Sequence, residues 1–275
     1  MDRWWINGKP GRAVDITDRG LAYGDGLFET IAIRQGRARF LDLHLDRLLD
    51  GLSRLRIRAP ERKRLSTALV TSVAGIAHGE LKLLVTRGPG PRGYRPPVEP
   101  ANTVAWGVGE STAHRAGPVT VRWCETMVAP NPATAGLKSL NRLEQVLARA
   151  EWSDPDVAEG LMTSTDGQLV GGTSSNVFLV MDGRLVTPDV TRAGIAGVMR
   201  RVIIESARAA GIPVSETAID PADLPLVDEV FLCNALTGIR PVAELGTRKW
   251  DGGAVTGRLQ ALLVARGVGE CAASF

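Results

Sequence analysis

The sequence predicts an α+β protein of two domains, and three observations lead to this prediction. Short runs of strand-forming residues are separated by turn signals, and other segments show the apolar spacing of amphipathic helices. The periodicity lapses over residues 110–118 (ESTAHRAGP). We therefore expect a smaller α/β domain at residues 1–112 and a larger domain with mixed sheets and helices at residues 113–275, each with its own core.

Turn signals and periodicity give the elements of the first domain in order. Asn7-Gly8 and Gln35-Gly36 each predict a β-hairpin. Leucines repeat along one helical face over residues 41–55, which predicts an amphipathic helix. The other expected elements are a helix after Pro60 and strands at residues 81–87 and 103–108.

The second domain is expected to begin with a strand at residues 119–123. A helix should follow Lys138, and its apolar side chains should face inward: Leu140, Leu143, Leu147 and Ala150. The remaining expected elements are turns at Asp166-Gly167 and Asp182-Gly183, helices at residues 198–210 and 256–265, and a strand at residues 229–233.

Composition narrows the classes of protein. Hydrophobic residues make up 44% and charged residues 23%, which is typical of a globular protein. No apolar run reaches the ~18 residues that span a bilayer, and the N-terminus lacks the apolar core of a signal peptide, so we expect no membrane partner and a cytoplasmic location. The three cysteines and three histidines are widely spaced, which predicts neither a disulfide framework nor a metal site.

Lys138 is distinctive among the five lysines. It lies where a loop is expected to enter a helix, and Leu137 and Leu140 flank it. Partial desolvation there would favour the neutral amine that forms Schiff bases. The alternative is a lysine that extends to solvent, but a cation is disfavoured at the positive end of a helix.

Two other segments could bind anions. Residues 194–200 (GIAGVMR) place glycines directly before a helix, whose first N–H groups could hold a phosphate, and Arg47 could add a bidentate contact or remain solvated. The loop at residues 87–94 combines two arginines with glycines, which suits carboxylates or a plain surface loop. The basic stretch at residues 54–64 lacks interleaved aromatic residues, so we interpret it as a solvated helix junction and expect no nucleic-acid partner.

Taken together, these segments resemble the fold-type IV pyridoxal-phosphate enzymes, and within them the aminodeoxychorismate lyases of folate biosynthesis. The run KSLNRLEQVL after Gly136 and Leu137 is specific to the lyase subgroup, whereas YGDGLFET is shared across the fold type. The matching stretches follow the family's order over nearly the whole chain: residues 18–30, 44–48, 86–94, 136–147, 172–178, 194–200 and 233–236.

The resemblance implies a homodimer that uses pyridoxal 5'-phosphate to convert 4-amino-4-deoxychorismate to 4-aminobenzoate and pyruvate. Lys138, in the domain at residues 113–275, would hold the cofactor covalently and move protons. The other residues implied to contact the cofactor are Arg47, Gly171, Asn176, Val198, Met199, Asn234 and Ala235. Those implied to contact the substrate are Tyr23, Phe28, Arg87, Arg92, Tyr94, Leu236 and Thr237.

The sequence departs from this family at Gly171. Five residues before Asn176 the family usually carries a glutamate, which pairs with the pyridine nitrogen and keeps it protonated. A glycine cannot do this, so the cofactor ring should accept electrons less well. That suits elimination of a good leaving group better than transfer of an amino group. An aminotransferase acting on branched-chain or D-amino acids is the alternative function.

Overall fold

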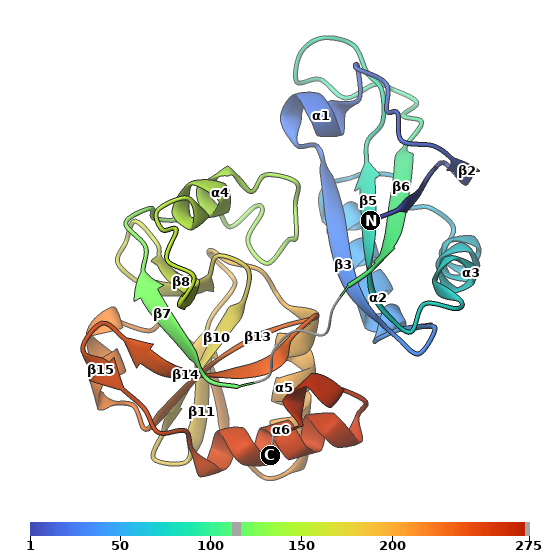
Figure 1. Cartoon of the computed structure of the whole chain (residues 1–275). Helices are drawn as coiled ribbons and strands as arrows, with labels where there is room; N and C mark the ends of the chain where they lie inside the picture. Colours follow the sequence, from blue (N-terminus) through green and yellow to red (C-terminus); the bar gives the residue numbers. More distant parts are fainter. Residues whose placement is uncertain (112–116, 273–275) are drawn as a thin grey trace. The chain divides into compact units, whose positions relative to one another are not determined.

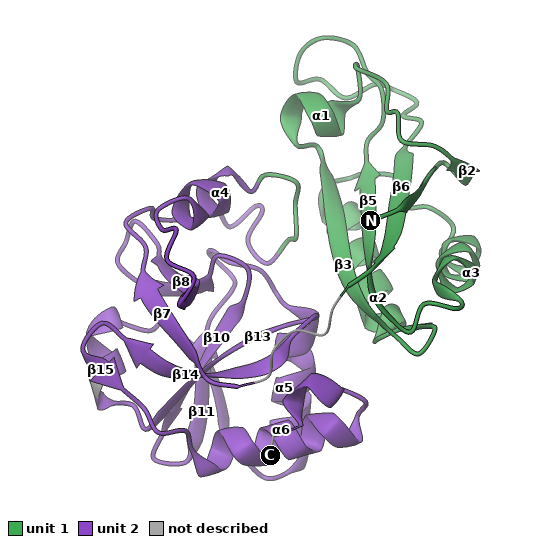
Figure 2. Cartoon of the chain, viewed as in Figure 1, with its two compact units in different colours: residues 1–113, 137–141 green, residues 114–136, 142–275 purple. Residues whose placement is uncertain are grey.

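A computed structural model describes residues 1–111 and 117–272 of the chain (Figure 1). These residues form two compact units (Figure 2). Unit 1 is Met1–Ala113 together with Leu137–Asn141, and unit 2 is His114–Gly136 together with Arg142–Phe275. The expected domain boundary at residues 112–113 lies outside the described residues.

Unit 1 contains a six-stranded sheet whose neighbouring strands pair antiparallel in the order β2-β1-β6-β5-β3-β4. Asn7-Gly8 and Gln35-Gly36 connect its two tight hairpins, and both residues of each pair have positive φ. The hairpin predictions are thereby confirmed, since such turns match the twist of the strands. The strands are β1 (Arg3–Ile6), β2 (Lys9–Pro10), β3 (Gly26–Arg34), β4 (Arg37–Ala38), β5 (His78–Thr86) and β6 (Thr103–Glu110).

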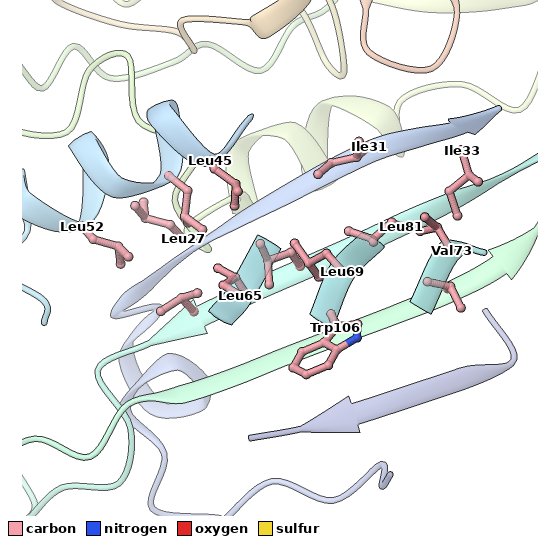
Figure 3. Packing of buried hydrophobic residues seen from close by; sticks show 14 of the residues in the cluster. Leu27, Ile31, Ile33, Leu45, Leu52, Leu65, Leu69, Val73, Leu81 and Trp106 are labelled. Carbon is pink, nitrogen blue, oxygen red and sulfur yellow. The ribbon is translucent and has the colours of Figure 1, made fainter. Parts of the chain in front are cut away.

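Helices α2 (Leu41–Arg54) and α3 (Arg62–Val73) pack their leucines against this sheet, as Figure 3 shows for Leu45, Leu52 and Leu65. Leu27, Ile31 and Ile33 of β3 lie in the same core. Because side chains alternate along a strand, Glu29 also points toward α2, whereas Phe28 and Thr30 point to the opposite face of the sheet. The short helix α1 (Arg19–Tyr23) precedes β3.

The segment Leu137–Asn141 packs in unit 1, although the residues on either side of it belong to unit 2. It extends along β3: the Phe28 N–H donates to the Lys138 carbonyl and the Leu140 N–H donates to the Gly26 carbonyl, each at 3.0 Å. This corrects the assignment of Lys138 to the second domain. Sequence periodicity records only local order, whereas these hydrogen bonds join residues more than a hundred positions apart.

Unit 2 contains a nine-stranded mixed sheet, which follows the order β12-β11-β10-β13-β14-β7-β8-β9 with β15 paired to β14. Three of its strand pairs are parallel: β11 with β12, β14 with β7, and β7 with β8. The strands are β7 (Val119–Trp123), β8 (Val157–Thr163), β9 (Leu169–Gly172), β10 (Asn176–Met181), β11 (Arg184–Pro188), β12 (Val214–Thr217), β13 (Glu229–Asn234), β14 (Gly238–Leu245) and β15 (Arg248–Lys249). The prediction of an α+β protein is confirmed.

The helices of unit 2 are α4 (Leu143–Arg149), α5 (Val198–Ala209) and α6 (Ala254–Ala265), with 3₁₀ turns at Pro221–Leu226 and Gly269–Cys271. The expected burial of the α4 leucines is wrong: Leu143 is 70% and Leu147 54% exposed, and Ala148 is the buried residue of the helix. The helix begins only at Leu143, because residues 138–140 are extended against β3, and this changes which face packs. No helix in the described part of the chain is long and apolar enough to cross a membrane.

Candidate active site

Lys138 lies beside an aromatic ring in unit 1. Its ammonium nitrogen is 4.4 Å from the centroid of the Phe28 ring, and the nitrogen of Lys82 on β5 is 3.8 Å from the same centroid. Burial lowers the pKa of Lys82, an effect that the charges of Glu29 and Glu80 oppose. The structure thus places Lys138 and a second amine, that of Lys82, over the same Phe28 ring.

Arg47 is held by a buried carboxylate beneath α2. Its Nε is 2.8 Å from Oε1 of Glu29 and its Nη2 is 2.5 Å from Oε2, while Nδ1 of His44 lies 2.7 Å from Oε2. Burial alone would raise the pKa of Glu29, but the Arg47 charge and the hydrogen bonds from His44 and Arg47 lower it to about 2. An ionised carboxylate only accepts hydrogen bonds, so Nδ1 of His44 carries the proton. The two contacts with Glu29 therefore fix the orientation of the Arg47 guanidinium.

Arg87, which the sequence resemblance assigned to the substrate, is bound to residues of its own unit. Its guanidinium donates to both carboxylate oxygens of Asp25, at 2.8 and 3.0 Å, and to the carbonyls of Leu55 and Arg56. These contacts use four of its five N–H donors, and the residue is 8% exposed. Through its hydrogen bonds to the Leu55 and Arg56 carbonyls, Arg87 therefore connects the end of β5 to the residues after α2.

Arg19 and Tyr23 hold the tip of the loop that follows Arg87. Arg19 donates to the carbonyls of Gly93 and Tyr94 at 2.9 and 3.0 Å, and the Tyr23 hydroxyl accepts from the Gly93 N–H at 2.9 Å. The rings of Tyr23 and Tyr94 meet edge to face with centroids 5.5 Å apart. The loop thus has a defined shape, and its side chains Arg92 and Tyr94 are exposed at the tip.

In unit 2, the loop before α5 leads to the N-terminal end of that helix and its first backbone N–H groups. Gly197 precedes the helix without a side-chain cap among the described residues, so the first N–H groups of α5 at Val198 and Met199 face outward from the helix end. The Asn176 side-chain amide donates to the Ile195 carbonyl at 2.9 Å, and a Cβ at Gly197 would meet its oxygen. The Gly136 backbone, two residues before Lys138, also bonds this loop at Gly194 and Ala196.

A second turn lies next to Asn176 on the neighbouring strand. Asn176 pairs with Cys233, which precedes Asn234 at the end of β13. The Asn234 side-chain oxygen accepts from the Leu236 N–H, the Thr237 N–H and the Thr237 hydroxyl at 2.9–3.0 Å. Asn234 therefore shapes the turn that carries Ala235, Leu236 and Thr237.

Gly171 lies near the end of β9 with a φ of 154°. A Cβ there would be 3.0 Å from the Ser175 carbonyl oxygen. The backbone at this position therefore suits glycine, and no carboxylate is attached to it.

Comparison with known proteins gives a family match and similar proteins over most of the chain. The family model "Amino-transferase class IV" matches residues 26–245. An aminodeoxychorismate lyase of Vibrio harveyi is 33% identical over 255 residues, covering 88% of this chain and 91% of that protein. A putative branched-chain-amino-acid aminotransferase of Methanocaldococcus jannaschii is 34% identical over 264 residues, covering 89% of this chain and 88% of its own.

Among solved structures, the 4-amino-4-deoxychorismate lyase of Pseudomonas aeruginosa is similar over nearly its full length. It is 44% identical with a TM-score of 0.91, and the match covers 95% of this chain and 98% of that chain. Since both sequence and fold agree over this span, the likeness extends to both units.

Proposed function

Since the chain belongs to the class IV aminotransferase family, we propose that it is a pyridoxal-phosphate-dependent lyase that converts 4-amino-4-deoxychorismate to 4-aminobenzoate and pyruvate. The observation that carries this proposal is Lys138, which lies beside Phe28 within the run KSLNRLEQVL. The 44% identity to the lyase of Pseudomonas aeruginosa supports it over nearly the whole chain.

The residues present fit the cofactor. A phosphate dianion needs N–H donors and cations, and Arg47 and the first turn of α5 have that chemistry. Gly197 has no side chain, and a Cβ there would collide with Asn176. Only backbone atoms therefore stand at the start of α5. When bound, pyridoxal phosphate supplies an electron-accepting ring that stabilises the charge left at a carbon after loss of its proton.

We assign the covalent attachment and the proton transfer to Lys138. The Lys138 amine would accept the proton from the substrate carbon that bears the amino group. Pyruvate leaves as its enol from the adjacent carbon, and the electron pair left by the removed proton forms the third double bond that makes the ring aromatic. Phe28, which packs against the Lys138 nitrogen, keeps the amine at one position during these transfers.

Substrate recognition requires cations, because 4-amino-4-deoxychorismate carries two carboxylates. We propose Lys82 and Arg92 for this role. Lys82 lies over the Phe28 ring beside Lys138, and Arg92 is at the tip of the loop that Arg19 and Tyr23 hold. Tyr23, Tyr94, Leu236 and Thr237 stay proposed contacts, whereas Arg87 is replaced by Lys82.

We also propose that the enzyme is a cytoplasmic homodimer. Leu143, Val146 and Leu147 form an apolar face on α4, and each is more than half exposed. A second copy of the chain would remove this face from water. The three cysteines are few and widely spaced in the sequence, as in proteins of a reducing compartment. Light scattering tests the dimer: Val146→Asp should yield monomers, and an unchanged mass would remove this face from the interface.

An aminotransferase is the second candidate, because a relative with that description is 34% identical to this chain. The absence of a carboxylate at Gly171 argues against it, since amino-group transfer depends more strongly on a protonated pyridine nitrogen. One experiment separates the two functions. The purified holoenzyme is given 4-amino-4-deoxychorismate, or branched-chain and D-amino acids with a keto-acid acceptor. Release of 4-aminobenzoate and pyruvate supports the lyase, and rapid transamination without lyase activity would overturn it.

A further inference from the structure

Unit 2 contains a buried carboxylate that the proposed reaction does not use. Glu159 on β8 is 6% exposed, and its oxygens accept hydrogen bonds from three successive residues. Thr173 donates its N–H at 3.1 Å and its hydroxyl, Ser174 donates its N–H at 3.2 Å and its hydroxyl at 2.6 Å, and the Ser175 hydroxyl donates at 3.0 Å. The Gly160 N–H adds a sixth contact at 3.2 Å.

This number of donors explains how a carboxylate is tolerated here. A buried carboxylate is costly unless hydrogen bonds replace its water. Arg240 of β14 adds a long-range charge: burial lowers the pKa of its guanidinium, and the charge of Glu159 opposes that shift. The carboxylate is therefore a fixed centre around which residues 173–175 are arranged.

Glu159 does not substitute for the carboxylate that is missing at Gly171. A Cβ on Gly172 would meet the Glu159 side chain at 2.9 Å, whereas a Cβ on Gly171 would meet the Ser175 carbonyl. Successive residues of a strand point to opposite faces. The Glu159 side chain thus lies on the other face of β9, and its oxygens are occupied by the turn.

The turn that Glu159 holds leads directly to Asn176. Residues 173–175 join β9 to β10, which begins at Asn176. The Asn176 amide in turn holds the Ile195 carbonyl, in the loop that opens α5. One line of contacts therefore runs from the carboxylate through the turn to the backbone before Val198.

We propose that Glu159 is a positioning residue for the phosphate of the cofactor. It fixes the 173–175 turn so that Asn176 holds the loop before α5, and the N–H groups of that helix end are thereby presented to the phosphate. The inference rests on the proposed function in that the ligand is pyridoxal phosphate. It assigns no chemical step to Glu159.

The test compares two aldehydes that differ only in the phosphate. Apoenzyme is titrated with pyridoxal phosphate and with pyridoxal, for the wild type and Glu159→Gln, and the melting temperature of each apoprotein is measured. We expect the Kd for pyridoxal phosphate to rise at least about tenfold in Glu159→Gln, because one of the two acceptor oxygens of the turn is replaced by an NH2 group, which only donates. The Kd for pyridoxal, which is bound through Lys138 without a phosphate, should change less than about twofold.

Glu151→Gln is the matched control, since Glu151 accepts two backbone N–H groups of the same unit, at Glu125 and Thr126, away from this turn. It should leave both affinities unchanged. Should Glu159→Gln fail to fold, Ser174→Ala and Ser175→Ala, which each remove one hydroxyl donor, are expected to shift the phosphate-dependent affinity in the same direction. An equal rise in Kd for pyridoxal phosphate and pyridoxal would overturn the positioning role. So would an unchanged Kd for pyridoxal phosphate in Glu159→Gln and in the serine variants. Wild-type protein that binds neither aldehyde would instead refute the proposed function.

Discussion

Glu29 on β3 and Arg47 on α2 form a two-point ion pair across the core of unit 1, with nitrogen–oxygen distances of 2.8 and 2.5 Å. The carboxylate is 1% exposed, whereas the arginine side chain is 16% exposed. The buried Glu29 carboxylate thus fixes the direction of the partly exposed Arg47 guanidinium. Planar bidentate pairs of this kind fix orientation as well as position.

We expect Glu29→Gln to weaken cofactor binding and to destabilise unit 1, because Arg47 and His44 then face a neutral amide with one acceptor oxygen in place of a carboxylate with two. The folded-state pKa of Glu29, about 2, is below its ordinary value of 4.5. Its stabilising contribution, roughly 3 kcal/mol, is therefore present above pH 4.5 and is lost as the pH falls toward 2. Thermal unfolding between pH 7 and pH 3 measures this: the wild type should lose stability more steeply than Glu29→Gln, and parallel curves would contradict the assignment.

Replacement of Lys138 by alanine should abolish lyase turnover and the visible absorbance of bound cofactor. Lys82 lies near the same ring, so it serves as the matched control. Lys82→Ala should keep the covalent cofactor while raising KM for the dianionic substrate. Borohydride trapping followed by peptide mapping identifies the attachment site, and cofactor found on Lys82 would reverse the two roles.

The exposed arginine of the glycine-rich loop is expected to act on substrate rather than on cofactor. Arg92→Ala should raise KM by a factor that corresponds to about 1.5–3 kcal/mol, the contribution of one charge-assisted hydrogen bond. The Kd for pyridoxal phosphate should not change. Steady-state kinetics and cofactor titration check both parts, and loss of cofactor with an unchanged KM would place Arg92 elsewhere.

Tyr23→Phe tests whether the shape of this loop matters. The substitution removes only the hydroxyl that accepts from the Gly93 N–H, and it keeps the ring that packs against Tyr94. We expect KM to rise by about three- to tenfold, the effect of roughly 0.5–1.5 kcal/mol, with kcat nearly unchanged. Equal kinetics in the two proteins would show that Arg19 holds the loop by itself.

Gly171 should determine reaction preference. Wild-type enzyme is expected to transaminate amino acids slowly, and Gly171→Glu should increase the ratio of transaminase to lyase activity by supplying a carboxylate. The same change should lower the melting temperature, because φ is 154° and the Ser175 carbonyl would lie 3.0 Å from the new Cβ. Gly171→Ala controls for this strain, since it adds the Cβ without the charge; an equal change in preference for both variants would exclude the carboxylate as the cause.

Local sequence signals predicted those elements whose conformation depends on a few neighbouring residues. The glycine-containing turns predicted both hairpins of unit 1, and the leucine spacing predicted α2, because positive φ and helical periodicity depend on a few neighbouring residues. The ordered motifs around Lys138 and Arg47 predicted the fold-type IV architecture, the family and the cofactor. The roles of the individual site residues stay predictions, which the experiments above address.

The sequence by itself thus determined several of the secondary-structure elements, the family and the candidate residues, while the tertiary structure decided how buried charges are paired. Arg87 and Arg92 lie in the same glycine-rich stretch of sequence and could not be distinguished there. In the structure, Arg87 forms an ion pair with Asp25, whereas Arg92 is exposed. Residues 138–140 were expected to lead into a helix, but they extend against β3. Glu29 and Glu159 gave no local signal. A carboxylate gains its role from donors brought to it by packing, and those donors lie up to 18 positions away in sequence.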